Sequence, residues 1–312
     1  MGLYSADECL QEVLASFGKE LAGIITGDTR WTDLMVNPDG RVWMDSSGME
    51  EVKCVIPRNG LLAAATTLAS YSGSSFNGRE GQSLACVIPV LGLRAEFIGP
   101  PAAKAVSMVV RRPAPRVWTL GDLAAVHTVT DEQKEALTQA VKNRVNIIVS
   151  GGTASGKTTL TNALLSEVDG KDRLYVVEDV DELKLSQPNA IKLLVNADYS
   201  YSRAIADALR CRPDRIIVGE CRRGDQVLEM IKAWNTGHPG GIATIHANDA
   251  RSALLRLDQL VSEVSASSQL GIIKDTVGLI VHMDRVRGSG ERVVSQILDV
   301  FKDELIYENG QK

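Results

Sequence analysis

The segment that most restricts how this chain folds is glycine-rich and spans residues 151–158, Gly-Gly-Thr-Ala-Ser-Gly-Lys-Thr. It has the spacing G-x-x-x-x-G-K-[ST], follows an apolar run at 145–150 and opens a stretch with helical spacing at 158–167. A strand, a glycine loop and a helix in this order are the context in which the spacing makes a phosphate-binding loop. The segment therefore predicts an α/β domain in which one strand leads into that loop.

The residue types of this segment suit a polyphosphate. Glycines allow many backbone N–H groups to approach the anion, and the helix that follows directs its positive end toward it. Lys157 adds a mobile positive charge for the β- and γ-phosphates, and Thr158 supplies a hydroxyl ligand for Mg²⁺. The alternative interpretation is a glycine-rich turn that binds no ligand. The residues expected to bind the polyphosphate are Gly151, Gly152, Thr153, Ala154, Ser155, Gly156, Lys157, Thr158 and Thr159.

The composition is that of an ordinary globular protein. Of the 312 residues, 44% are hydrophobic and 23% are charged, which excludes a disordered, a collagen-like or a disulfide-scaffold chain. The net charge of −5 does not indicate a basic groove, so we expect no sequence-specific binding of nucleic acid. The longest nearly apolar stretch, at 61–69, is too short to span a bilayer.

The cysteines and the N-terminus indicate a cytoplasmic protein. The five cysteines are scattered and form no CxxC pair, which argues against a zinc site and favours reduced thiols. Acidic residues stand near the N-terminus, where a secretory signal needs a basic start and an apolar core. We therefore expect a cytoplasmic location.

The pattern of the chain divides it into two domains. Residues 1–112 combine helical periodicity, which starts at a capping box (Ser5–Glu8), with short antiparallel strands, and this mixture predicts an α+β domain. A Pro-Ala-Pro segment then interrupts the pattern and predicts a linker at 113–119 that acts as a hinge. Strands alternate with helices in 120–312, which predicts a mostly parallel sheet covered by helices on both faces.

Acidic residues follow two apolar strands at the sheet edge where ligands bind in an α/β fold. Glu178 ends the first of these strands (174–178), so it can reach a metal directly or through water. We therefore expect Glu178 to join Thr158 as a ligand of Mg²⁺. The alternative for Glu178, and more so for Asp181 and Glu182, is a solvated acidic turn.

The second acidic position is Glu220, which follows the strand 215–219. Gly219 stands where an ordinary Walker B strand has an aspartate, which leaves Glu220 as the acid expected to polarise the attacking water. The alternative is a structural salt bridge between Glu220 and Arg222. His246 ends another strand at the same edge and is a candidate sensor of the γ-phosphate, although a strand-end histidine is commonly structural.

Four motifs in a fixed order carry a resemblance to the type II/type IV secretion traffic ATPases, and most closely to the conjugal-transfer ATPases of the Trb type. They are GGTASGKTTLTNALL (Walker A), YVVEDVDEL (Asp box), ALRCRPDRIIVGECR (atypical Walker B) and GHPGGIATIHAND (His box). The segments DLMVNPDGRVWMD and VSMVVRRP resemble the N-terminal domain and its junction in that family. The likeness therefore spans most of the chain.

This resemblance implies a RecA-like P-loop ATPase domain joined by a flexible linker to a smaller α+β N-terminal domain, with ATP held between the two. It assigns Lys157 and Thr158 to phosphate and Mg²⁺, and Glu178 to the Asp box. It also assigns Glu220 to catalysis and His246 to phosphate sensing.

The resemblance further implies arginines that reach the nucleotide and stabilise phosphate charge, as an arginine finger does. A surface or ion-pair role is the alternative for each of them. Arg223 departs from the family, whose members usually have glycine there. The candidate arginines are Arg94, Arg111 and Arg112 from the N-terminal domain and junction, and Arg210 and Arg222 near the Walker B strand.

The function implied by the resemblance is that of a motor. ATP hydrolysis in a homo-hexamer would power conjugative transfer, type IV secretion and pilus assembly, with other subunits of the apparatus and at the periphery of the inner membrane. One alternative is a pilus-retraction or type II secretion ATPase, which the short N-terminal domain, the GHPGG stretch and the missing CxxC module disfavour. The other is a nucleotide-gated scaffold that hydrolyses little ATP, which Gly219 favours.

Overall fold

The computed structural model describes residues 5–27, 31–46, 48–112, 117–196, 198–286 and 289–308. The chain divides into two compact units, residues 1–115 and 116–312. Hydrophobic cores lie within each unit, one in the first and two in the second. Of the expected linker at 113–119, residues 113–116 lie outside the described part of the chain.

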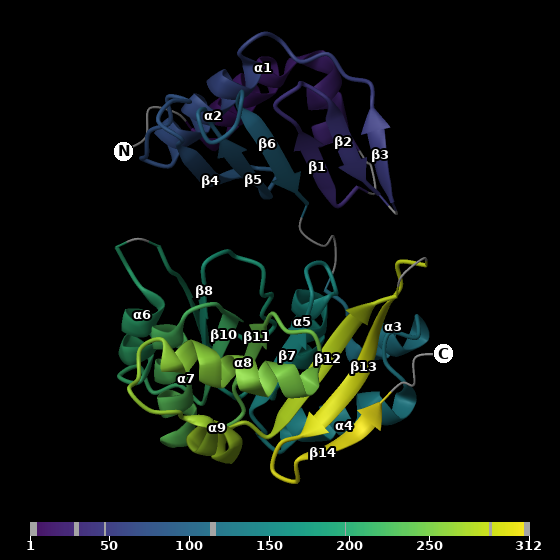
Figure 1. The fold of residues 1–312 in the computed structure, drawn as a ribbon, viewed down its shortest axis with the longest axis vertical. Helices are drawn as coiled ribbons and strands as arrows, with labels where there is room; N and C mark the ends of the chain where they lie inside the picture. Colours follow the sequence, from purple (N-terminus) through teal and green to yellow (C-terminus); the bar gives the residue numbers. More distant parts are fainter. Residues whose placement is uncertain are drawn as a thin grey trace. The chain divides into compact units, whose positions relative to one another are not determined.

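The first unit is a six-stranded antiparallel sheet with two helices packed against one face (Figure 1). The strand order is β3-β2-β1-β6-β5-β4. Burial alternates along the strands, as in β5, where Leu93, Ala95 and Phe97 are buried and face the helices. The elements are α1 (Ala6–Thr26), β1 (Asp33–Val36), β2 (Val42–Asp45), β3 (Met49–Val52), α2 (Gly60–Tyr71), β4 (Ser83–Ile88), β5 (Leu93–Ile98) and β6 (Ser107–Arg111).

Helix α1 begins as the sequence predicts. The Ser5 hydroxyl accepts a hydrogen bond from the Glu8 N–H at 3.3 Å, and the Glu8 carboxylate accepts one from the Ser5 N–H at 2.8 Å. The helix is kinked at Gly18, whose φ of 80° lies in the left-handed region. Glycine is required there because a Cβ would lie 2.8 Å from the ring of Pro57.

The second unit is an eight-stranded sheet with the order β14-β13-β12-β7-β11-β10-β8-β9. The six strands from β12 to β9 are parallel, and β13 and β14 extend the sheet as an antiparallel meander. The strands are β7 (Ile147–Gly151), β8 (Leu174–Glu178), β9 (Ala190–Leu194), β10 (Arg215–Cys221), β11 (Ile242–Ile245), β12 (Leu279–Arg285), β13 (Arg292–Asp299) and β14 (Glu304–Glu308).

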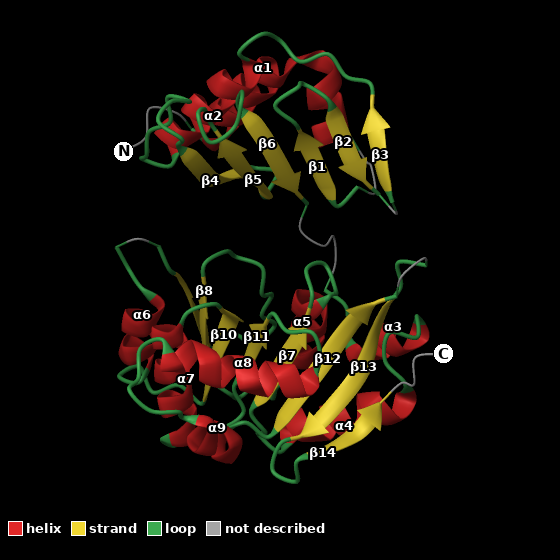
Figure 2. Cartoon of the chain, viewed as in Figure 1, coloured by secondary structure: helices red, strands yellow, loops and turns green. Residues whose placement is uncertain are grey.

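Helices cover both faces of this sheet, as the sequence predicts (Figure 2). One core joins the sheet to α3, α4 and α5, and the other joins it to α6 through α9. In β7, Ile147 and Val149 belong to the first core and Ile148 to the second. The helices are α3 (Leu120–Ala125), α4 (Asp131–Lys142), α5 (Lys157–Ser166), α6 (Tyr201–Ala208), α7 (Gly224–Asn235), α8 (Ala250–Ser262) and α9 (Leu270–Thr276).

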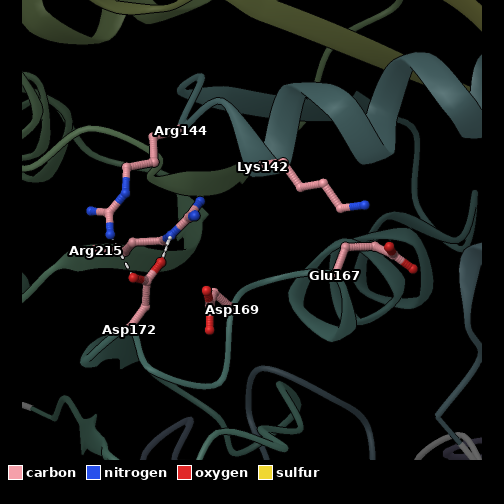
Figure 3. A pocket seen from close by; sticks show the side chains of 6 residues that line it. All are labelled: Lys142, Arg144, Glu167, Asp169, Asp172 and Arg215. Atoms are coloured by element: carbon pink, nitrogen blue, oxygen red, sulfur yellow. Dashed lines mark hydrogen bonds and ion pairs between the residues drawn. The ribbon is translucent and has the colours of Figure 1, made fainter.

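A cavity of about 420 Å³ lies at the sheet edge where the strands begin, away from the phosphate-loop edge (Figure 3). The Asp172 carboxylate in its wall pairs with Arg144 at 2.5 Å and with Arg215 at 2.6 Å. Arg215 is buried and also donates to the carbonyls of Val141 and Gly240. These charges therefore satisfy one another and tie the start of β10 to the end of α4. The cavity is lined by Lys142, Arg144, Glu167, Asp169, Asp172 and Arg215.

Candidate functional site at the carboxyl edge of the sheet

Four predicted site positions lie at one edge of the second unit. Strands β7, β8, β10 and β11 are parallel neighbours, so their carboxyl ends share that edge. Gly151 and Glu178 are the last residues of β7 and β8. Glu220 is the next-to-last residue of β10, and His246 follows β11 directly. The topology therefore assembles residues that are up to 95 positions apart in the chain, from 151 to 246.

The loop after β7 has the backbone that its glycines permit. Gly151 and Gly156 have φ values of 152° and 98°, and Ala154 has a φ of 59° although it carries a Cβ. A Cβ on Gly151 would lie 2.4 Å from the Met283 carbonyl oxygen, so only glycine fits between β7 and β12. Of the other positions predicted to bind phosphate, Gly152 and Thr153 are exposed and Thr159 is half-buried.

Lys157 and Ser155 have polar groups directed at the loop itself. The buried Lys157 ammonium donates to the carbonyls of Gly151 at 3.1 Å and Gly152 at 2.8 Å. The Ser155 hydroxyl is buried and has no hydrogen-bond partner among the described residues. A mobile cation and an unsatisfied hydroxyl within a loop of N–H donors are what a polyphosphate requires, so these residues fit that ligand.

Glu182, rather than Glu178, is the carboxylate next to Thr158. The Thr158 hydroxyl donates to Glu182 Oε2 at 3.1 Å. Glu178 is buried and accepts from the backbone N–H groups of Glu182 and Leu183, both at 3.0 Å, while its other oxygen lies 2.8 Å from Lys192 Nζ. Glu178 therefore holds the turn that presents Glu182, and its expected role as a ligand of Mg²⁺, directly or through water, stays a prediction.

Burial raises the pKa of the Glu178 carboxyl, although Lys192 and the two N–H groups oppose that rise. The same ion pairs, with Glu178 and with Asp181, raise the pKa of the Lys192 ammonium against the effect of its own burial. A protonated Lys192 stabilises the charged form of Glu178. Lys192 lies in β9, a strand that we did not predict, and no motif in the sequence singled this lysine out.

The structure explains why glycine stands at 219. A Cβ on Gly219 would lie 2.8 Å from the Glu178 Cβ and 3.4 Å from its Cα. The space that a Walker B aspartate would occupy is therefore filled by Glu178 from the neighbouring strand β8. The Gly219 carbonyl also accepts a hydrogen bond from the Thr244 hydroxyl at 2.7 Å.

His246 connects the loop lysine to Glu220. Its Nδ1 lies 3.4 Å from Lys157 Nζ, and its Nε2 lies 2.9 Å from Glu220 Oε1. An ammonium group can only donate, so Nδ1 is the acceptor and the proton resides on Nε2, facing the carboxylate. Burial lowers the pKa of His246, and the Lys157 charge lowers it further, which favours the neutral ring.

Arg222 holds the other oxygen of Glu220. Its guanidinium lies 2.6 Å from Glu220 Oε2 and 2.6 Å from Asp179 Oδ2. The salt bridge that was the alternative interpretation of Glu220 is thus present, together with the contact to His246. Arg223 has an extended backbone with a φ of −131°, so its replacement of glycine leaves the turn into α7 intact.

Three other expected arginines have partners within their own units. Arg210 is exposed and lies between the end of α6 and the start of β10, at the opposite edge of the sheet, with Asp207 at 3.8 Å. In the first unit, Arg111 pairs with Asp33 at 2.8 Å. Arg112 donates to the Ile25 carbonyl at 3.0 Å, with its guanidinium carbon 4.2 Å from the ring centroid of Trp31. Arg94 lies in β5.

Two further features concern the described part of the chain. Within the described residues, no cluster of three or more His, Cys, Asp or Glu side chains could hold a metal ion. Within the same residues, every helix is too short or too polar to cross a membrane.

His238 contacts the Ala233 carbonyl at 3.2 Å, at the end of α7.

The chain is similar to known proteins over most of its length. The Type II/IV secretion system protein family matches residues 82–300. The conjugal transfer protein TrbB of Rhizobium radiobacter is 36% identical over 294 residues, which cover 93% of this chain and 90% of the relative.

Two solved structures share the fold. The VirB11 ATPase from the Brucella suis type IV secretion system, in complex with sulphate, superimposes with a TM-score of 0.51 at 25% identity, covering 96% of this chain and 97% of that chain. The Legionella pneumophila ATPase DotB has a TM-score of 0.59 at 18% identity, covering 94% and 80%, a likeness of fold alone. The expected fold class, a RecA-like domain with a smaller α+β domain, is confirmed. The chain belongs to the Type II/IV secretion system protein family.

Proposed function

We propose that this chain hydrolyses ATP with Mg²⁺ at the loop of residues 151–158. The observation that carries the proposal is the contact path from Lys157 through His246 to Glu220, with distances of 3.4 and 2.9 Å. The cation suited to the terminal phosphates and the carboxylate suited to polarise water are thus separated by one imidazole ring. Nucleotide hydrolysis requires both groups to act on the same phosphate.

The oxygen donors beside Thr158 fit Mg²⁺. The Thr158 hydroxyl and the Glu182 carboxylate lie 3.1 Å apart, and hard oxygen ligands are those that Mg²⁺ prefers. When bound, Mg²⁺ would neutralise charge on the β- and γ-phosphates. Glu178 contributes indirectly. It accepts hydrogen bonds from the backbone N–H groups of Glu182 and Leu183, and these bonds fix the turn that carries Glu182.

The residues of the path have distinct tasks. Lys157 leaves the loop carbonyls to bind the terminal phosphates, and this removes the cation that neighbours His246 Nδ1. His246 then responds to the phosphate and transmits the change through its Nε2–H to Glu220. Glu220, oriented by Arg222, accepts a proton from the attacking water.

We further infer that the chain acts in a type IV secretion or conjugative-transfer apparatus, as a homo-hexamer at the periphery of the inner membrane. The similarity to TrbB and to the VirB11 ATPase supports this inference. Arg210 is exposed, with Asp207 at 3.8 Å, and stays a candidate for a contact with the nucleotide of a neighbouring subunit. Arg94, Arg111 and Arg112 remain candidates for nucleotide contacts from the N-terminal unit.

A nucleotide-gated scaffold is the second candidate function. Glu220 has one oxygen 2.9 Å from His246 and the other 2.6 Å from Arg222, so both oxygens are occupied in this conformation. A carboxylate that stayed in these contacts would not reach water. ATP would then change the shape of the chain without rapid turnover.

Phosphate release by wild type and Glu220→Gln separates the two functions. A general base contributes about 10²–10⁴-fold to rate, so we expect Glu220→Gln to lose at least about 100-fold in kcat and to keep its affinity for ATP. Glu229→Gln, which removes an acid that pairs with Lys232 on α7, is the control and should keep wild-type turnover. Equal, slow release by wild type and Glu220→Gln would support the scaffold instead.

A further inference from the structure

The hairpin of β12 and β13 brings the end of β12 and the start of β13 to the phosphate loop. Strand β12 runs parallel to β7 with Met283 opposite Gly151, and β13 returns antiparallel with Arg292 opposite Arg285 (Figure 1). The carboxyl end of β12 and the start of β13 therefore lie at the same sheet edge as the loop. Arg292, the first residue of β13, is exposed there.

Arg292 makes two contacts with the loop. Its Nε donates to the Ala154 carbonyl oxygen at 3.0 Å. Its side-chain stem packs over Gly156, where a Cβ would lie 3.1 Å from Arg292 Cδ. Among the described residues, no carboxylate pairs with the Arg292 guanidinium. The contacts to Ala154 and Gly156 therefore orient the Arg292 side chain.

The carbonyl that Arg292 holds is a sensitive point of the loop. Ala154 has a φ of 59°, a left-handed conformation that is unfavourable for a residue with a Cβ and needs support from its surroundings. A carbonyl oxygen that turned toward the bound anion would repel it, whereas the loop binds through converging N–H groups. A donor outside the loop that fixes this oxygen thus favours the binding conformation.

We propose that Arg292 is a positioning residue of the nucleotide site: by donating to the Ala154 carbonyl it keeps the phosphate loop in the shape that binds the β-phosphate. This inference rests on the proposed nucleotide-binding function and adds to it a residue outside the four motifs. Arg292 acts on the loop through a hydrogen bond, so its positive charge is not what the nucleotide requires. Affinity for ADP and ATP depends on it, and the chemical step does not.

Two substitutions separate the hydrogen bond from the charge. In Arg292→Gln the amide nitrogen takes the place of Nε, so a donor remains and the charge is lost. In Arg292→Met the side chain still reaches the position of Nε, but the hydrogen-bond donor is lost. One hydrogen bond of this kind corresponds to about tenfold in binding, so we expect Arg292→Met to raise the Kd for MgADP about tenfold and Arg292→Gln to stay within about threefold of wild type.

The control is Arg285→Met, which removes the cross-strand neighbour of Arg292 and should leave the Kd for MgADP unchanged. For each variant kcat should remain near the wild-type value while KM follows Kd, a split that loss of folding would not give. Because Arg292 is exposed, melting temperatures should shift by less than about 2 °C. Should Arg292→Met fold poorly, Arg292→Asn replaces it, since its amide is one bond too short to reach the carbonyl.

Equal loss of affinity in Arg292→Gln and Arg292→Met would overturn the inference, because it would mean that the charge acts on the nucleotide directly. Unchanged affinity in Arg292→Met would overturn it as well. In both results wild type still binds MgADP, so the proposed function would stand. Wild type that binds neither MgADP nor MgATP would refute the proposed function and this inference together.

Discussion

The imidazole of His246 lies between the Lys157 ammonium and the Glu220 carboxylate, with Nδ1 3.4 Å from the first and Nε2 2.9 Å from the second. Residues at the carboxyl ends of β10 and β11 and in the phosphate loop meet at this point. Because the ring is neutral, it can accept at Nδ1 and donate at Nε2 at the same time. The neutral ring of His246 thus links the Lys157 ammonium to the Glu220 carboxylate.

Replacing His246 should slow hydrolysis more than it weakens binding. We expect His246→Ala to lower kcat by about 10- to 100-fold, because Glu220 loses an orienting donor, and to change the KM for ATP by less than about threefold. Steady-state phosphate release measures both constants. His238→Ala is the control, since His238 contacts the Ala233 carbonyl away from the loop, and it should behave as wild type. A rise in KM with unchanged kcat would contradict the assigned role.

The lowered pKa of His246 predicts a loss of stability in acid. Burial and the Lys157 charge make the folded protein bind a proton at His246 less tightly than the unfolded chain does. The contribution of His246 to stability is therefore complete above the ordinary histidine pKa of about 6.5 and is lost as the pH falls through the lower folded value. Urea unfolding at pH 5 to 8 should show this decrease.

His282 should make stability depend on pH in the same direction as His246. Burial also lowers the pKa of His282, which lies in β12 with the Ser150 hydroxyl at 2.9 Å and Asp284 at 3.4 Å. His246→Gln should therefore reduce the decrease in unfolding free energy below pH 6.5 without abolishing it. An unchanged pH profile in His246→Gln would show that the pKa of His246 is not lowered by folding.

Glu182 should set the requirement for Mg²⁺. Glu182→Gln removes the negative charge beside the Thr158 hydroxyl, 3.1 Å away, so we expect it to need about tenfold more Mg²⁺ for half-maximal hydrolysis. Asp181→Asn is the matched control, because Asp181 pairs with Lys192 and Lys184 rather than with Thr158. Titration of activity with MgCl₂ at saturating ATP distinguishes the two. An equal shift in both variants would count against Glu182.

Restoring the usual Walker B aspartate should harm this chain. The Gly219→Asp side chain would overlap Glu178 in β8, and overpacking of this kind costs about 1–3 kcal/mol of unfolding free energy. Displacement of Glu178 should also release the turn that carries Glu182, so activity should fall. Gly170→Asp is the control, because nothing lies within 4 Å of a Cβ at that position. Higher turnover in Gly219→Asp would contradict the steric explanation.

Asp172 should be essential for the stability of the second unit. Asp172→Ala would leave Arg215 buried without its carboxylate, and breaking such a pair costs about 3–5 kcal/mol. Denaturant unfolding measures this loss. Asp169→Ala, at an exposed position in the same cavity, should change stability by no more than about 1 kcal/mol. Comparable losses of stability in the two variants would show that the Asp172–Arg215 pair is not what stabilises the second unit.

Much of the second unit was predictable because its signals are local. The apolar run at 174–178 became β8 at the same residues, and the phosphate loop lies between β7 and α5 as its spacing indicates. Among the elements that we did not predict are β3, α3, β9 and β14. The three strands are short and partly exposed, so they lack the buried apolar run that identifies a strand in the sequence.

The sequence alone determined which chemical groups are present and at which ends of strands they stand, because glycine spacing and hydrophobic periodicity act between near neighbours in the chain. Only the tertiary structure decided which groups meet. The register of β8 against β10 puts Glu178 beside Gly219, and the turn after β8 presents Glu182 to Thr158. Such contacts depend on packing between segments far apart in sequence, where a shift of one residue would move every side chain to the other face.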